Sequence, residues 1–231
     1  MKRICIYIIL TAGLFVSCQH KPVFHVMGTI TEAEDETLYL EHTTLLKTIV
    51  IDSCILNAEG EFSLQASTPV YPDFYRLRIG KTSLPLAVDS TETITITTTR
   101  DSLPYTLSIQ GSDNSLTIAQ LRNTARTASR DEVRDVAKHI IVTNPRSLAA
   151  YYAVFFKQNG EYIWNVLDPA DRRMYQAVAT SFYTWMPDYE RTTAIYTQVK
   201  EVIQAERAVN QQVVMQQIID NAQNAFLDIA L

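Results

Sequence analysis

The stretch FHVMGTI, residues 24–30, alternates apolar residues with polar or small ones at a period of two. That alternation is typical of a strand with one face buried and the other in water. The residues on the buried face would be Phe24, Val26, Gly28 and Ile30. The pattern returns in TLYLEH (37–42), EFSLQA (61–66), DFYRLRI (73–79) and ETITITTT (92–99). The connections leave no room for helical crossovers, so an antiparallel β-sandwich is predicted over residues 23–110.

The connections between these strands carry turn residues, and one of them is specific enough to assign positions. NAEG, residues 57–60, places Asn57 at the start and Gly60 at the end of a short loop. Asparagine side chains hydrogen-bond nearby backbone groups in turns, and glycine adopts positive φ without steric cost. We therefore expect Asn57 and Gly60 to form a structural turn, with positive φ at Gly60.

Near GSDNSLTIAQL, residues 111–121, the apolar period lengthens from two to about 3.6 residues, which is typical of helices. A helical region of about four helices is predicted over residues 111–223, and the last helix is long, about 188–221. The start signals of the first three are Ser129 with Glu132, Asn144 with Pro145, and Asp168 with Pro169. The predicted fold class is therefore α+β, an antiparallel β-sandwich followed by helices.

Aromatic residues recur at helical spacing in the second predicted helix, which is expected to end at Gly160. Tyr152, Phe155 and Phe156 would lie on its apolar face. Aromatic residues in such a pattern most often belong to the core, so we expect a core role. A ligand groove is the alternative.

The first 17 residues have the layout of a secretory signal, with Lys2 and Arg3 before an apolar run over residues 4–16. The run is shorter than the roughly 20 residues that a helix needs to cross a bilayer, so cleavage is expected. Ser17 followed by Cys18 resembles the lipobox of bacterial lipoproteins, in which the cysteine is diacylated and becomes the mature amino terminus.

This resemblance implies a signal peptide at residues 1–17 and a lipidated tether at residues 18–22. The lipid on Cys18 would attach the protein to a membrane of the cell envelope, facing the periplasm and most consistent with the outer membrane. An ordinary cleaved signal, with Cys18 incidental, is the alternative.

The composition excludes some partners and leaves one thiol to consider. The chain has 231 residues, 47% of them hydrophobic, and a formal net charge of −5. Its basic residues are scattered among acidic ones, which argues against a nucleic-acid partner. Once Cys5 is removed and Cys18 lipidated, Cys54 is the remaining thiol. Strand-forming residues surround it, so we expect it to be buried and slow to react.

Motifs for catalysis, cofactors and metals are missing from the sequence. Dithiol chemistry normally uses C-x-x-C, and the chain contains none. His20, His25, His42 and His139 lack the spacing of metal ligands and are expected to be single surface residues. Glycine-rich phosphate loops and G-x-S-x-G are also absent. We therefore predict no catalytic, cofactor-binding or metal-binding residues, and no enzyme activity.

Three segments together resemble a known domain: residues 24–42, 52–64 and 72–97. They are similar to the domain of unknown function at the amino-terminal end of thioredoxin-like lipoproteins of Gram-negative bacteria. The matching positions are Gly28, Ile30, Leu38, Tyr39, Leu40, Asp52, Ser53, Asn57, Gly60 and Phe62. TNPRSLAAYYAVFF, residues 143–156, resembles the helical region that precedes the thioredoxin fold in those proteins.

The resemblance implies a role beside a redox domain that this chain does not contain. NAFLDIAL, residues 224–231, looks like the approach to the first strand of that domain, so we expect the start of a missing C-terminal domain or a tail there. The implied function is a non-catalytic, lipid-anchored periplasmic module of a thiol:disulfide oxidoreductase system. It would position a thioredoxin-like domain or its protein clients. The alternative is a stand-alone lipoprotein that binds a ligand or partner.

Overall fold

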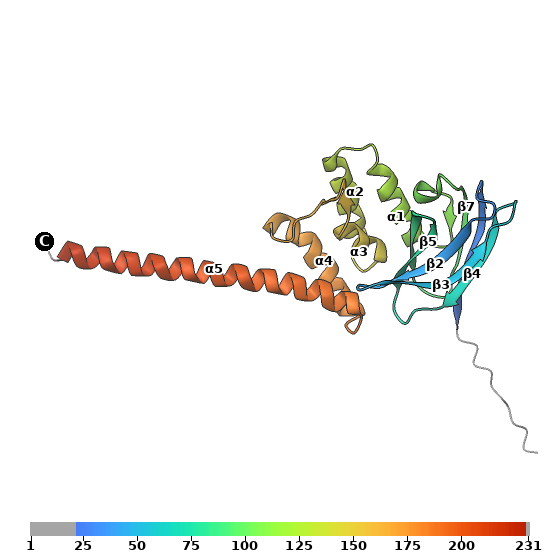
Figure 1. Cartoon of the computed structure of the whole chain (residues 1–231). Coiled ribbons are helices and arrows are strands. Elements are labelled where there is room, and N and C mark those ends of the chain that lie inside the picture. Colours follow the sequence, from blue (N-terminus) through green and yellow to red (C-terminus); the bar gives the residue numbers. More distant parts are fainter. Residues whose placement is uncertain (1–21, 230–231) are drawn as a thin grey trace, which may run out of the picture.

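The computed structural model describes residues 22–229 of the chain, with side chains described up to residue 220. The predicted signal peptide at residues 1–17 and the lipidation site Cys18 lie outside these residues. Within them, strands form the first part of the chain and helices the second (Figure 1). The predicted α+β fold class is confirmed.

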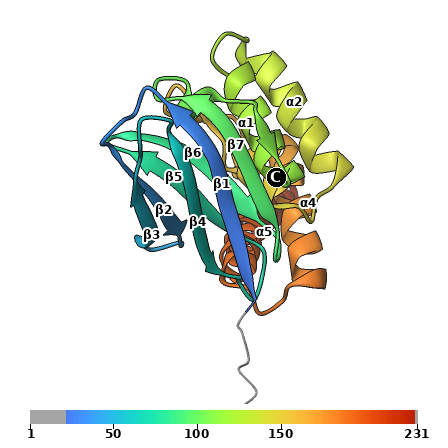
Figure 2. The same ribbon diagram turned by 90° about the vertical axis from the view of Figure 1, so that its right-hand side faces the viewer.

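Two four-stranded sheets face each other across an apolar core. The strands are β1 (Val23–Thr31), β2 (Thr37–Thr43), β3 (Thr48–Ile55), β4 (Glu61–Ser67), β5 (Asp73–Ile79), β6 (Thr82–Val88), β7 (Thr93–Thr99) and β8 (Ile109–Gln110). Their orders are β4-β1-β7-β8 and β3-β2-β5-β6, and Figure 2 shows β1 between β4 and β7. Phe24, Val26 and Ile30 are fully buried, as the alternation predicts. Each such side chain contributes about 1.5–3 kcal/mol of hydrophobic stabilisation.

One strand pair departs from the antiparallel prediction. β1 runs antiparallel to β4 but parallel to β7, with Val26 opposite Ile94 and Gly28 opposite Ile96. The chain reaches β7 only after passing through both sheets, so no hairpin dictates the direction of this pair. The sandwich is therefore mixed.

The turn over residues 57–60 joins β3 to β4 and is hydrogen-bonded on both sides. Gly60 N donates to the Asn57 carbonyl at 2.9 Å, and Asn57 Oδ1 accepts from Glu61 N at 3.0 Å. Gly60 has a φ of +71°, and its carbonyl accepts from Ile30 N at 2.8 Å. Asn57 and Gly60 thus fix the start of β4 against β1.

Five α-helices follow the strands, where about four were predicted. They are α1 (Asp113–Thr124), α2 (Arg130–Thr143), α3 (Leu148–Val154), α4 (Pro169–Trp185) and α5 (Glu190–Ile229), preceded by a single 3₁₀ turn at Leu103–Tyr105. The additional helix is α1, whose apolar residues point in two directions. Leu116 and Ala119 pack on the sandwich core, whereas Ile118 and Leu121 pack among the helices. The sequence therefore shows no single apolar stripe there.

Two serines fasten α1 to the free edge of β6. Ser112, the N-cap of α1, donates from Oγ to the Ala87 carbonyl at 2.8 Å, and Ala87 N donates to Ser115 Oγ at 2.9 Å. β6 is the last strand of its sheet, so these buried backbone groups would otherwise have no partner. The contacts cover the strand edge and fix α1 against the sheet.

Both ends of α3 differ from the prediction. Asn144 caps the end of α2, and the N-cap of α3 is Ser147. The helix ends at Val154, well before Gly160. Asn159 and Gly160 have φ values of +52° and +86° and form the tight turn of a hairpin, a common role of Asn-Gly pairs. The hairpin strands are β9 (Lys157–Gln158) and β10 (Glu161–Tyr162).

The helices and the sandwich share a packed interface. Phe74 of β5 and Ala87 of β6 are buried among the helices, in contact with a core that includes Leu121, Tyr151 and Phe182. Figure 1 shows α1 to α4 gathered on one side of the sandwich. The change from strands to helices near residue 110 therefore occurs within one continuous packed body.

The first part of α5 belongs to this body. Ile195 and Val199 are buried in the helical core, and α5 packs along α4. Arg172 of α4 donates from Nη1 to Glu206 Oε2 at 2.5 Å. Beyond that pair the helix leaves the body and projects outward (Figure 1).

The second part of α5 is a free-standing helix. Its side chains over residues 204–220 are exposed. The helix continues to Ile229, so residues 224–229, predicted to begin a further domain or tail, extend the same helix. Across residues 22–229, no helix is both long and apolar enough to cross a membrane.

Candidate functional site

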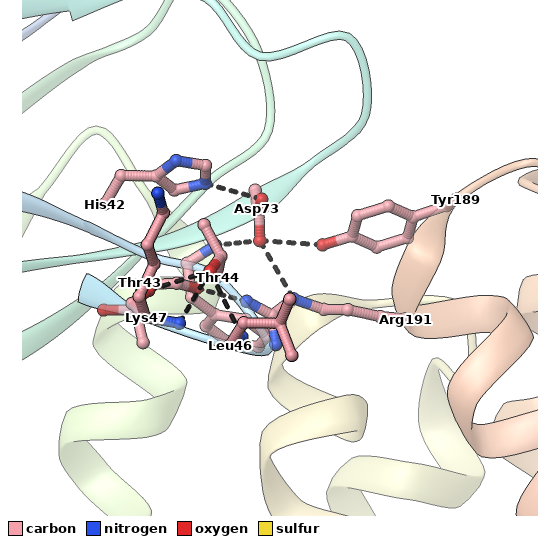
Figure 3. A network of polar contacts seen from close by, with 9 residues as sticks. His42, Thr43, Thr44, Leu46, Lys47, Asp73, Tyr189 and Arg191 are labelled. Atoms are coloured by element: carbon pink, nitrogen blue, oxygen red, sulfur yellow. Dashed lines mark hydrogen bonds and ion pairs between the residues drawn. The ribbon is translucent and has the colours of Figure 1, made fainter. Parts of the chain in front are cut away.

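Asp73, at the start of β5, accepts hydrogen bonds from several elements (Figure 3). Its Oδ2 atom accepts from His42 Nε2 at 2.7 Å. Its Oδ1 atom accepts from the Tyr189 hydroxyl at 2.8 Å, from Arg191 Nε at 2.9 Å and from Phe74 N at 2.7 Å. We call Asp73, His42, Tyr189 and Arg191 the Asp73 joint, because they tie the sandwich to the base of α5.

The surroundings of the Asp73 joint favour a charged carboxylate. Burial alone raises the pKa of Asp73, but the His42 hydrogen bond, the Arg191 charge and two further hydrogen bonds bring that pKa below its ordinary value. Burial and the neighbouring carboxylate raise the pKa of the Tyr189 phenol, which therefore stays a donor. The Asp73 and Arg191 side chains are 10% and 7% exposed, so they form a buried ion pair.

Arg191 completes the joint from the helix side. Its guanidinium lies over the ring of Phe74, with Cζ 4.9 Å from the ring centroid, and 5.8 Å from that of Tyr151. Its Nη2 atom donates to the Thr43 carbonyl at the end of β2. Both the face and the edge of the guanidinium are thus engaged by the protein, which indicates a structural role.

The pairing of His42 with Asp73 has the form of an acid/base dyad, but its surroundings differ from those of a hydrolytic triad. In a hydrolytic triad the histidine also bonds a serine or cysteine nucleophile. Across the part of the chain that the structure describes, no such residue hydrogen-bonds His42, whose ring stacks on Tyr75 at 4.8 Å between centroids. Histidine here fastens a carboxylate; it is not the single surface residue that the sequence predicted.

A groove of about 640 Å³ lies beside the joint, between the outer face of β5 and β6 and the helical layer. This volume is within the range typical of small-ligand sites. Its aromatic lining consists of Phe74, Tyr75, Tyr105, Tyr151, Tyr152, Phe155 and Phe156. The aromatic residues expected in the core of the second predicted helix therefore also line a groove, the alternative left open by the sequence.

The charged residues that line this groove all have the same sign. They are Arg76, Arg122, Arg126, Lys157 and Arg191. Arg76 pairs with Glu41 at 2.5 Å, and Arg191 pairs with Asp73. Among the side chains described, those of residues 22–220, no carboxylate pairs with Arg122, Arg126 or Lys157. The groove therefore carries local positive charge in a chain whose net charge is −5.

Residues 24–115 match the family described as Domain of unknown function (DUF4369). No curated protein and no solved structure matched the chain. The DUF4369 segment covers the two sheets and ends in the first turn of α1, at the serines that hold this helix to β6.

The DUF4369 segment contains only part of the Asp73 joint and only one wall of the groove. Asp73 and His42 lie inside it, whereas Tyr189 and Arg191 lie far beyond it. Likewise, β5 and β6 supply one wall of the groove from inside the segment, and α3 and β9 supply the other from outside. The joint and the groove therefore both require the helical layer.

A second hollow, of about 820 Å³, lies between α1 and α2 outside the groove and has an acidic lining. Asp89 and Asp135 line it, together with His139. Burial raises the pKa of Asp89 despite a 2.8 Å hydrogen bond from Asn114. Glu92 Oε1 accepts from Asp89 N at 2.8 Å, and burial together with the Asp89 charge raises the pKa of Glu92 to about 7.

Glu92→Gln is expected to flatten the pH dependence of stability between about pH 5 and pH 7. The pKa of Glu92 is about 7 in the folded protein and about 4.3 in an unfolded chain. The folded state therefore binds the Glu92 proton more tightly than the unfolded chain does. The contribution of Glu92 to the free energy of unfolding falls as pH rises from 5 to 7, by an amount on the order of 1 kcal/mol. Urea unfolding at pH 5, 6 and 7 measures the slope. An equal slope in the variant would refute the assignment, and Glu59→Gln in the exposed turn is the control.

The other candidate residues from the sequence are two cysteines, Cys54 and Cys18. Cys54 is a free, half-buried thiol in β3 that packs against the sandwich core. Burial and then the Asp52 charge raise its pKa, so little reactive thiolate forms. Cys18 lies outside the described residues. Over the part of the chain with described side chains, no cluster of three or more His, Cys, Asp or Glu residues is placed to hold a metal ion.

Proposed function

We propose that this chain is a non-catalytic, lipid-anchored module of the bacterial cell envelope that uses α5 to position another protein domain. The observation that carries this proposal is the course of α5, which is fixed in the body at its base and continues outward as one helix (Figure 1). We call residues 207–229 the arm. At about 1.5 Å per residue, the arm is roughly 35 Å long.

The base of α5 is held in a way that supports a fixed direction for the arm. The Asp73 joint fastens the start of the helix to the sandwich through Tyr189 and Arg191. One side of the helix then packs along α4 up to the pair of Arg172 and Glu206. Two separated attachment points constrain the direction of a helix more than one point would.

The composition of the arm supports contact with a protein surface. Residues 208–219 include no charged side chain. The large apolar residues exposed there are Val209, Val213, Val214, Met215, Ile218 and Ile219. They are distributed around the helix, and apolar groups in this arrangement are stabilised when another surface covers them. A thioredoxin-like domain or a protein client, as the family resemblance implies, would provide that surface.

The position of the first strand is consistent with a lipid anchor on the side of the body away from the arm. The sandwich begins at β1, whose start lies on the opposite side of the body from the end of α5 (Figure 1). A lipid on Cys18 would therefore hold the body to the membrane while the arm extends from its other side. Several acyl chains make such an attachment durable.

The anchoring half of the proposal is tested by labelling in a bacterial host. The wild-type protein is expected to incorporate labelled palmitate and to fractionate with membranes, because diacylation of Cys18 precedes cleavage in the lipoprotein pathway. Cys18→Ser should lose the label. Unlabelled wild-type protein that is released by osmotic shock would contradict the anchor.

The positioning half is tested in the same cells with a photo-crosslinking amino acid. At Val214 on the arm it is expected to capture a protein that mass spectrometry identifies as carrying a thioredoxin-like C-x-x-C domain. At Val70, a 93% exposed residue on the sandwich, it should not. Equal capture at both positions, or none at Val214, would contradict a positioning role of the arm.

A second candidate function is that of a stand-alone, ligand-binding lipoprotein. The basic, aromatic groove beside the Asp73 joint favours it, because that groove has both the volume and the polar groups of a ligand site.

A further inference from the structure

We propose that the groove between β5, β6 and the helical layer binds the carboxyl terminus of a peptide whose final residues are apolar or aromatic. The proposal rests on the second candidate function and requires neither the lipid on Cys18 nor the arm. Its test is therefore independent of the anchoring and positioning experiments.

Two arginines near the end of α1 are presented to the groove without a carboxylate partner. Arg122 Nη1 donates to the Tyr152 hydroxyl at 3.1 Å. Arg126 lies over the ring of Tyr105, with Cζ 4.0 Å from the ring centroid. Tyrosines hold both guanidinium groups in place and leave their charge unneutralised, so each retains donors for an anion.

A lysine supplies positive charge from the neighbouring hairpin. Lys157 Nζ lies 4.2 Å from the ring centroid of Tyr162, the residue opposite it in the β9–β10 pair. The next residue, Gln158, donates from Nε2 to the carbonyls of Ala125 and Ala128 at 3.2 and 3.0 Å. The hairpin that carries Lys157 is thus fastened to residues 125–128, the segment after α1 that includes Arg126.

The charge pattern identifies a carboxylate as the complementary group. No aspartate or glutamate lines the groove, although the chain as a whole is acidic. On the same outer face of the sheet, Arg76 and Arg78 instead share Glu41, at 2.5 and 2.7 Å. A carboxylate from outside would supply the partner that Arg122 and Arg126 lack, and a guanidinium binds a carboxylate with two parallel hydrogen bonds.

The rest of the groove lining fits a short peptide. The aromatic walls would accommodate apolar or aromatic side chains, with Phe155 and Phe156 from the end of α3 among them. Ser83 and Asn159 add neutral polar groups that can pair with peptide bonds. The groove is open to solvent, so the chain preceding the bound terminus can leave it freely.

The test is isothermal titration of the full chain, purified in detergent, with N-acetyl-Ala-Leu-Phe as the free acid and as the carboxamide. The free acid is expected to bind at least about tenfold more tightly, because it alone offers the anion, and added salt should narrow the difference. Equal binding of acid and amide, or no binding of the acid, would overturn the proposal. Indole-3-acetate binding as tightly as the tripeptide would overturn the peptide assignment in favour of a small aromatic acid.

Charge-removing variants locate the binding to these cations. The triple variant R122Q, R126Q and K157Q should bind the acid no better than the amide. A matched triple, K138Q, K200Q and R207Q, removes exposed charges outside the groove and should leave affinity unchanged. Retained preference for the acid in the first triple would refute the site. Circular dichroism checks that both triple variants fold. If the first triple variant unfolds, the single variant Arg126→Gln, at an exposed position, must weaken binding of the free acid at least about threefold.

Discussion

Asp73→Asn is expected to destabilise the protein by about 3–5 kcal/mol, because the substitution leaves the Arg191 guanidinium buried without its counter-charge. Asparagine keeps the size of the side chain, so the loss reports the charge and its hydrogen bonds rather than a cavity. Urea unfolding at pH 7 measures the change. The control is Glu36→Gln, since Glu36 is 39% exposed and pairs with Arg100, and such pairs contribute less than about 1 kcal/mol. Similar losses in both variants would contradict a buried joint.

The same variant has a defined pH signature. The pKa of Asp73 is lower in the folded protein than in an unfolded chain, where it is about 3.9. The wild type therefore has the full contribution of this carboxylate above about pH 4 and loses it as pH falls through the folded pKa. Asp73→Asn lacks the group that titrates, so the difference between the two proteins should shrink in acid. A constant difference down to pH 2 would contradict the assignment.

Gly60→Ala is expected to cost about 3 kcal/mol or more, from two effects at one position. Alanine at a φ of +71° bears a left-handed strain of about 1–2 kcal/mol. Its Cβ atom would also lie closer than 3.0 Å to the Ile30 carbonyl, a backbone group of β1 that cannot move without disturbing the sheet. Thermal and urea unfolding measure the combined loss.

Gly160→Ala separates the two effects. Gly160 has a comparable φ of +86°, but a Cβ atom there would meet no atom within 4 Å. Only the backbone strain of about 1–2 kcal/mol is expected at this hairpin turn. Equal losses of stability in Gly60→Ala and Gly160→Ala would show that the close approach of Gly60 to β1 adds nothing to the cost of the substitution.

Local patterns in the sequence were enough to predict the sandwich and most of the helices. Burial alternates along β4 and along the first residues of β1 and β7, as the sequence pattern predicts. Ser129 with Glu132 forms the predicted capping box. The N-cap Asp168 before Pro169 also starts α4 as predicted. These features depend on residues a few positions apart, so a single sequence is enough to predict them.

The features that were missed depend on packing between distant parts of the chain. α1 lies between two cores, so its apolar residues face both ways and its polar Ser115 is fully buried against β6. The direction of β7 is set by the path of the chain between sheets. In both cases the deciding contacts join residues that local periodicity does not relate.

The candidate site was the least predictable part. Asp73 and Arg191 are 118 positions apart, and each looks like an ordinary surface charge in the sequence. The sequence itself shows only that Asp73 precedes Phe74 at the start of a predicted strand. That Phe74 packs among the helices is visible only in the structure. The groove likewise combines β5, α1, α3 and β9, and its charge becomes visible only when paired and unpaired cations can be distinguished.

A distance measurement between the sandwich and α5 tests the central claim, that the body holds the arm in a fixed direction. Cysteines that carry spin labels would replace Ile55 on β3 and Val209 on the arm, both exposed. The three native cysteines would be removed by Cys5→Ala, Cys18→Ser and Cys54→Ala. Pulsed electron paramagnetic resonance should give a single narrow distance distribution, and adding Asp73→Asn should broaden it by releasing the base of the helix. A broad distribution in the protein with an intact Asp73 joint would contradict the account, because a freely moving helix cannot position a partner.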